Sequence, residues 1–242
     1  MASALHGQSV LVTGGGRGLG AAISEALAAE GAKLFVADID ESSARACAER
    51  LRTRGFTAEA MRMDVTDEGD IARGIGHVHE TARGLDVVVN NAAIDKTLPI
   101  EELSIADWDR VLATNLRGPF LVARQAVKYM RQRERGHIVN IASTASKRAW
   151  PNASAYHATK WGLLGLSHAL HAELRPLGIK VTAVIAGGMR TPFLLDRFPD
   201  IDVTTLQDPA NVARAVRFAL SMPAESVVAE IMVLPMRETS WP

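Results

Sequence analysis

The sequence predicts an α/β fold, a doubly wound parallel sheet of about seven strands with helices on both faces. Short apolar runs rich in β-branched residues alternate with longer helical patterns along the whole chain. The runs are apolar at almost every position, as in strands that are covered on both faces. No repeat or low-complexity linker divides the 242 residues, so we expect a single domain spanning 1–242.

The strand and helix candidates follow one another in a regular order. The strongest strand candidates are 9–14, 33–38, 86–91, 137–143 and 180–187, and the weaker ones are 57–65 and 229–234. Helices are expected at 18–30, 41–54 and 153–175, as a short and then a long helix within 105–133, and after an Asp208–Pro209 N-cap. In such a sheet the ligand lies at the carboxyl ends of the strands.

Composition and charge exclude several classes of partner. Lys plus Arg and Asp plus Glu both number 27, so the basic excess typical of a nucleic-acid-binding protein is missing. No apolar run approaches the ~18 residues of a membrane span. The amino-terminal residues do not have the pattern of a signal peptide, and a single cysteine, Cys47, fits a reducing compartment. We therefore expect a cytoplasmic protein without nucleic-acid or membrane partners. The seven histidines show no metal-ligand spacing, so no metal is expected.

A glycine-rich loop, "TGGGRGLG" at 13–20, joins the first strand to the first helix. Gly14, Gly18 and Gly20 allow a tight turn and a close approach of backbone to a pyrophosphate, and the helix amino terminus, with Leu19, offers N–H groups to phosphate. The flanking strand and helix are the context in which this pattern indicates a dinucleotide site. No Lys-Ser/Thr pair follows, which disfavours a nucleoside-triphosphate loop.

Two residues of opposite charge bear on the choice of dinucleotide. Asp38 ends the second strand, where a carboxylate accepts hydrogen bonds from ribose hydroxyls and repels the 2′-phosphate of NADP. Arg17, inside the loop, could instead meet that phosphate. Because the anion acts directly at the ribose, while Arg17 can turn to solvent, the sequence predicts NAD, with NADP less favoured.

A tyrosine and a lysine lie one helical turn apart among small residues. Tyr156 is one of two tyrosines, and Lys160 follows it at i+4 on the same helix face. This spacing alone also fits an ordinary, partly exposed helix. Ser143 ends a predicted strand, with Thr144 and Ser146 as alternative hydroxyls.

The chain resembles the short-chain dehydrogenase/reductase family, in its short single-domain branch with a Rossmann-type fold. Five motifs occur in the family's order, from Ser9 to about Leu234. They are "TGGGRGLG", Asp64-Val65, "NNAA" at 90–93, Asn115 in "TNLRGPF", and Ser143 followed by "YHATK". Two positions depart from the family: Ala93 replaces a glycine and Ala186 a proline, and the second change frees the loop that follows.

The resemblance implies catalytic roles for four residues. Tyr156 would be the acid/base, Lys160 its partner and a ribose anchor, and Ser143 would orient a carbonyl. Asn115 would hold a water that joins Lys160 to solvent. A nearby ammonium and an oxidised nicotinamide are expected to lower the pKa of the phenol. His157 points about 100° away from Tyr156 and is expected at the surface or an interface.

The resemblance also implies a cofactor-binding set. Its members beyond the loop and Asp38 are Asp64 and Val65 at the adenine, Asn91 and Ala92 at the adenosine ribose, and Gly188 and Thr191 near the nicotinamide, besides Tyr156 and Lys160. Asp95 and Lys96 fit either the border of a substrate mouth or solvated loop charges.

These expectations indicate an NAD-dependent oxidoreductase acting on a small or medium secondary alcohol or ketone. A short lid at about 188–207, with Phe193, Leu194, Leu195 and Phe198, suits a compact substrate. The alternatives are an NAD-retaining epimerase or dehydratase, which normally has a longer carboxyl-terminal domain, and a non-catalytic NAD(H) sensor. Family resemblance implies a homodimer or homotetramer that associates through 105–133 and 153–175. Trp241 in the tail suggests a contact with another subunit.

Overall fold

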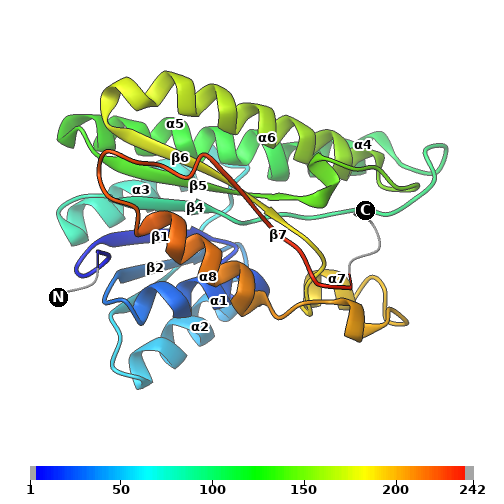
Figure 1. Ribbon diagram of the computed structural model, residues 1–242, viewed down its shortest axis with the longest axis horizontal. Coiled ribbons are helices and arrows are strands. Elements are labelled where there is room, and N and C mark those ends of the chain that lie inside the picture. The colour runs from blue at the N-terminus through cyan, green and yellow to red at the C-terminus, as the bar shows by residue number, and fades with distance from the viewer. Residues whose placement is uncertain (1–3, 238–242) are drawn as a thin grey trace.

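Strands and helices alternate through the computed structural model, which describes residues 4–237 (Figure 1). The strands are β1 Ser9–Thr13, β2 Lys33–Asp38, β3 Ala58–Arg62, β4 Val87–Asn90, β5 Gly136–Ser143, β6 Ile179–Ala186 and β7 Glu230–Val233. The helices are α1 Gly18–Ala28, α2 Glu41–Thr53, α3 Glu68–Ala82, α4 Ile105–Leu112, α5 Gly118–Met130, α6 Ser154–Leu174, α7 Pro192–Leu195 and α8 Pro209–Leu220. The tail with Trp241 lies outside the described residues.

The strands form one parallel sheet of seven, in the order β3-β2-β1-β4-β5-β6-β7. The expected fold class is therefore confirmed. The order reverses between β1 and β4, whose registered pairs include Val10–Val87 and Val12–Val89. Two crossovers lead away from this point on opposite sides, and in sheets of this kind the crevice that binds a ligand lies here, between the loops after β1 and β4.

Helices cover both faces of the sheet and each face has its own core (Figure 1). On one face α1, α2 and α8 bury residues such as Ile23 and Val216 against β1, β2 and β4. On the other face α3, α5 and α6 bury residues such as Ile75 and Val122. Strands covered on both sides must be apolar at successive positions, which is why their sequences do not alternate. Within residues 4–237 no helix is long and apolar enough to cross a membrane.

Segment 188–207 leaves the sheet after β6 and returns to its own starting point before α8. The backbone N–H of Arg190 donates to Gln207 O at 2.9 Å, and that of Gln207 donates to Gly188 O at 3.1 Å. The Gln207 side chain also donates to Val233 O on β7 at 3.0 Å. These bonds close the base of the segment, which contains α7 and projects from the carboxyl ends of the strands (Figure 1).

Candidate active site

The glycine loop and the end of β4 are tied together at the crevice. Asn91 donates from its side-chain amide to Thr13 O at 3.0 Å and to Gly14 O at 2.9 Å. Gly14 has a φ of +59°, and a Cβ there would lie 2.8 Å from Ala92 Cα, so only glycine fits. The first turn of α1 follows at once with Gly18, and the Arg17 side chain does not cap it, so its backbone N–H groups can bind an anion. The structure therefore brings the loop, Asn91 and Ala92 into one place.

Asp38 is fixed at the end of β2, beside the glycine loop. Its Oδ2 accepts from the backbone N–H of Gly16 at 3.0 Å, and its Oδ1 accepts from that of Asp40 at 3.1 Å. The carboxylate is thus held half-buried at the mouth of the crevice. Arg17 lies on the same loop and is exposed to solvent.

The tyrosine, lysine and serine come together at the ends of β5 and α6. The Lys160 ammonium lies 5.5 Å from the centroid of the Tyr156 ring and donates to Ile141 O on β5 at 2.9 Å. The Ser143 and Tyr156 hydroxyls are hydrogen-bonded to each other. All three side chains are buried. The predicted triad is therefore assembled, and Ser143 rather than Thr144 or Ser146 contacts the phenol.

Burial controls the protonation of this triad. Desolvation raises the pKa of Tyr156 to about 12, against the opposing hydrogen bond from Ser143. Desolvation also lowers the pKa of Lys160 to about 8. In the cofactor-free protein burial has the largest effect on the phenol, and the expected lowering of its pKa by an ammonium and an oxidised nicotinamide stays a prediction. Tyr156 is therefore a neutral phenol near pH 7.

Asn115 lies in a π-helical turn, Ala113–Arg117, between α4 and α5. Its side chain accepts from Ile94 N at 2.9 Å and donates to Ile94 O at 2.7 Å and to Thr159 Oγ1 at 3.2 Å. Thr159 in turn donates to Tyr156 O at 2.8 Å. Asn115 thus links the loop after β4 to the helix that carries Tyr156 and Lys160. Its predicted role as a water holder remains a prediction.

The remaining predicted cofactor residues lie in the turn after β3, on α1 and on segment 188–207. Asp64 Oδ1 accepts from the backbone N–H of Thr66 at 2.8 Å, which fixes the turn after β3. Val65 is buried beside Gly118. Thr191 lies across from the glycine loop, because a Cβ at Gly18 would be 3.4 Å from Thr191 Cβ. Leu19 packs into the core on the α1 face, and Gly188 forms the base of segment 188–207.

His157 is buried, so the expectation that it lies at the surface is wrong. The backbone N–H of Trp150 donates to His157 Nε2 at 3.1 Å, and His157 Nδ1 lies 3.0 Å from Ala145 O. Because Nε2 accepts, Nδ1 must carry the proton and donate to Ala145 O. The ring pairs edge-on with Trp150 at 4.3 Å. The helix turn does point it away from the site, but the loop after Ser143 folds over it.

One buried ion pair at the site was not expected from the sequence. Asp95, after β4, pairs with Arg197 of segment 188–207, and the Asp95 side chain is 5% exposed. The prediction that Asp95 borders the substrate mouth fits this placement, but Arg197 was not among the candidates. The two residues are 102 positions apart, and nothing in "LDRFPD" indicates a partner for the arginine. Within residues 4–237 no group of three or more His, Cys, Asp or Glu side chains is arranged to hold a metal ion.

Comparisons with known proteins agree with the fold. The family model for short chain dehydrogenase matches residues 8–202. A 2-(S)-hydroxypropyl-CoM dehydrogenase 3 from Xanthobacter autotrophicus is 34% identical over 91% of this chain and 92% of its own. A 3-alpha-(or 20-beta)-hydroxysteroid dehydrogenase from Mycobacterium tuberculosis is 35% identical over 91% of this chain and 85% of its own. A metagenomic short-chain oxidoreductase solved in complex with NADP superposes with a TM-score of 0.86 at 31% identity, covering 97% of this chain and 99% of that one.

The chain belongs to the short-chain dehydrogenase/reductase family. It is an oxidoreductase that acts on alcohol or ketone groups and uses a nicotinamide dinucleotide, NAD or NADP.

Proposed function

We propose that this enzyme transfers a hydride between NAD(H) and a small or medium secondary alcohol or ketone, with Tyr156 as the acid/base. The observation that carries the proposal is the buried cluster of Tyr156, Ser143 and Lys160 beside the crevice at the carboxyl ends of β1, β4 and β5. The short segment 188–207 over this cluster supports a compact substrate.

The residues around the crevice fit a dinucleotide. The Gly14 position has no room for a side chain, and the α1 amino terminus offers backbone N–H groups to a pyrophosphate. The Asp38 side chain is held by the Gly16 N–H where ribose hydroxyls would bind, which supports NAD over NADP. When bound, the nicotinamide supplies or accepts the hydride.

The triad then handles the proton at the substrate oxygen. In the reducing direction the Tyr156 phenol, neutral because burial raises its pKa to about 12, is a ready donor to that oxygen. Ser143, hydrogen-bonded to the phenol, is placed to hold the same oxygen. Lys160, next to the phenol and bonded to Ile141 O, is placed to stabilise a phenolate in the oxidising direction and to contact ribose.

The test is Tyr156→Phe, with the chain's other tyrosine as its control. The change removes the phenolic proton, so kcat should fall by roughly 10²–10⁴-fold. The Kd for NADH should change little, since the ring remains. Tyr129→Phe, on α5, should leave both values near wild type. Activity is measured as net NADH formed or consumed with a panel of secondary alcohols and ketones.

Two results would overturn the proposal. Full turnover by Tyr156→Phe would remove Tyr156 as the acid/base. Tight NADH binding by the wild-type chain, with no net NADH change on any substrate of the panel, would favour a cofactor-retaining enzyme or a sensor.

A further inference from the structure

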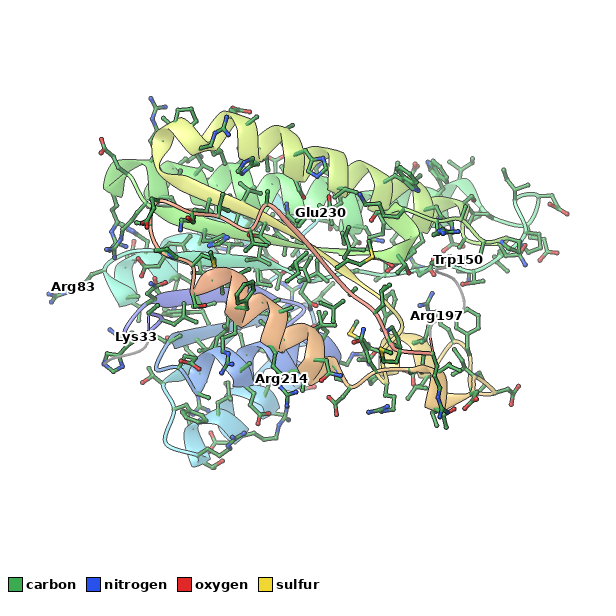
Figure 2. The ribbon with its side chains drawn as sticks, in the orientation of Figure 1. Lys33, Arg83, Trp150, Arg197, Arg214 and Glu230 are labelled. Carbon is green, nitrogen blue, oxygen red and sulfur yellow. The ribbon has the colours of Figure 1, made fainter. Side chains whose placement is uncertain are left out.

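The Asp95–Arg197 ion pair spans the mouth of the site. Asp95 lies in the loop after β4, and Arg197 lies on segment 188–207 just beyond α7. Figure 2 shows Arg197 at the end of the molecule where Trp150 also lies, away from the chain's amino terminus. The pair therefore connects the sheet's loops to a segment that is otherwise attached mainly at its base.

The Asp95 carboxylate is buried and fully engaged. Its Oδ1 accepts from the backbone N–H of Lys96 at 2.7 Å, and its Oδ2 accepts from Arg197 and from the Thr97 hydroxyl, the latter at 3.4 Å. A buried carboxylate that loses its ion-pair partner is strongly destabilised. Anything that draws Arg197 away therefore carries a large free-energy cost.

Arg197 continues the connection to the catalytic tyrosine. Its Nε donates to Phe193 O at 2.7 Å, and its guanidinium lies 4.2 Å from the Phe193 ring centroid and 5.4 Å from that of Phe198. The Phe193 ring is in turn 5.9 Å from the Tyr156 ring. A continuous series of contacts thus runs from Asp95 through Arg197 and Phe193 to Tyr156.

We propose that Asp95 and Arg197 are the specificity-determining pair of this enzyme. The pair holds segment 188–207 over Tyr156, and it cancels the charge at the mouth, so that the site selects uncharged alcohols and ketones. The proposal rests on the proposed function and names the substrate class within it. It adds two positioning residues that act on substrate choice and on closure.

A charged substrate would compete for one member of the Asp95–Arg197 pair, and this competition explains why the site selects uncharged substrates. A substrate carboxylate near the mouth would compete with Asp95 for Arg197 and leave Asp95 buried without its ion-pair partner. A substrate ammonium would compete for Asp95 and leave Arg197 between two aromatic rings without its anion. An uncharged substrate makes neither demand and packs against Phe193.

The test compares two single variants that break the same pair and leave opposite charges. The probes are a neutral secondary alcohol that the wild-type chain oxidises, and analogues of equal length that end in a carboxylate or an ammonium. Asp95→Asn frees Arg197 and should raise kcat/KM for the carboxylate analogue, relative to the neutral alcohol, about tenfold or more. Arg197→Met should raise the ratio for the ammonium analogue instead. Both should raise KM for the neutral alcohol.

The double variant separates selection from closure. Asp95→Asn combined with Arg197→Met restores an uncharged mouth without an ion pair. The preference for the neutral alcohol should return, while its KM stays high. Unchanged selectivity in both single variants, or a shift of both toward the same analogue, would overturn the assignment of specificity.

Closure is tested without any turnover. Hydrogen exchange of segment 188–207 in the cofactor-free protein should lose protection in both single variants, because each removes the contact that ties the segment to the loop after β4. Protection equal to wild type would overturn the closing role. Because this readout needs no reaction, it stands even if the proposed function fails on Tyr156→Phe.

The pH profile supplies a signature that a purely structural role would not produce. The charged groups around the Tyr156 phenol are Lys160, Asp95 and Arg197; Asp95 raises its pKa and Arg197 lowers it. The rise of kcat with pH in alcohol oxidation should therefore move to lower pH in Asp95→Asn and to higher pH in Arg197→Met. Shifts of the same sign would contradict the proposal.

Discussion

At the scale of single residues, Asp38 places a carboxylate where we propose that the cofactor ribose binds. Its Oδ2 is held by the Gly16 N–H, so the carboxylate cannot swing away from a 2′-phosphate without losing that hydrogen bond. Asp38→Ser removes the charge and keeps a small acceptor. We expect the ratio of kcat/KM for NADP to that for NAD to rise about tenfold or more.

Arg17 provides the matched comparison, because it lies on the same loop with the opposite charge. Arg17→Gln should leave kcat/KM for NAD near wild type and lower whatever activity the chain has with NADP. The solved relative that holds NADP shows that this fold accepts the phosphate. A wild-type preference for NADP would mean that Arg17 outweighs Asp38 at this site.

The positions of residues that belong to sequence motifs could be predicted, whereas properties that depend on burial could not. The spacing of Tyr156 and Lys160 and the order of the motifs placed both at one site correctly. Their pKa values depend on how much water the fold excludes, and the sequence does not contain that quantity. His157 shows the same limit, since its direction on the helix was predicted but the loop that covers it was not.

At the scale of elements, a buried histidine of β5, His137, contacts β6 and should make the free energy of unfolding depend on pH. His137 lies 2.8 Å from Thr182 Oγ1, whose own hydrogen goes to Val228 O, so His137 Nε2 donates. Burial, together with Lys180, lowers the pKa of His137 to about 3. The unfolded chain, with a histidine pKa of about 6.5, binds this proton first.

The contribution of His137 to the free energy of unfolding should therefore be fully present above about pH 6.5, and it should be lost as the pH drops toward 3. By linkage, His137 alone removes about 2 kcal/mol between pH 7 and pH 5. Urea unfolding at fixed protein concentration measures this loss. His137→Gln should flatten the pH dependence by that amount, whereas His6→Gln, at an exposed position, should not. Parallel curves for wild type and His137→Gln would contradict the prediction.

Helix α3 was not predicted from the sequence, and its glycines explain why. Its sequence includes Gly74 and Gly76, which lower helix propensity. Yet a Cβ at Gly74 would lie 2.9 Å from Met63 Sδ, so glycine allows the helix to pack closely on the end of β3. The Asp67 N-cap, followed by Ile71 and Ile75 at helical spacing, was the signal that could have identified it.

At the scale of the whole molecule, the doubly wound parallel sheet followed from the alternation of strands and helices, but the closing of segment 188–207 did not. Parallel strands linked by right-handed crossovers permit few arrangements, so the alternation suffices to predict the class of sheet. The Asp95–Arg197 pair depends instead on two loops meeting above the finished sheet. Such a contact is decided by tertiary packing, and no local pattern encodes it.

The face formed by α4, α5 and α6 is where we expect a second copy of the chain to bind. Ile105, Phe120 and Trp161 are exposed there by 75%, 45% and 52%. An apolar hollow lined by Leu112, Leu116 and Leu166 lies beside Phe120. Gly165 is exposed with open space where a side chain would be, which lets another helix approach closely. Exposed aromatic side chains gathered on one face are typical of an interface.

Charging this face should separate the subunits. Phe120→Glu places a carboxylate in the apolar hollow, so sedimentation velocity should show a shift from two or four chains toward one. Phe218→Glu is the matched control, because Phe218 is 52% exposed on α8, across the sheet from Phe120. It should keep at least the dimer, since it leaves the α4–α5–α6 face unchanged. A wild-type chain that sediments as a monomer, or a Phe120→Glu variant with the wild-type mass, would show that this face binds no second copy.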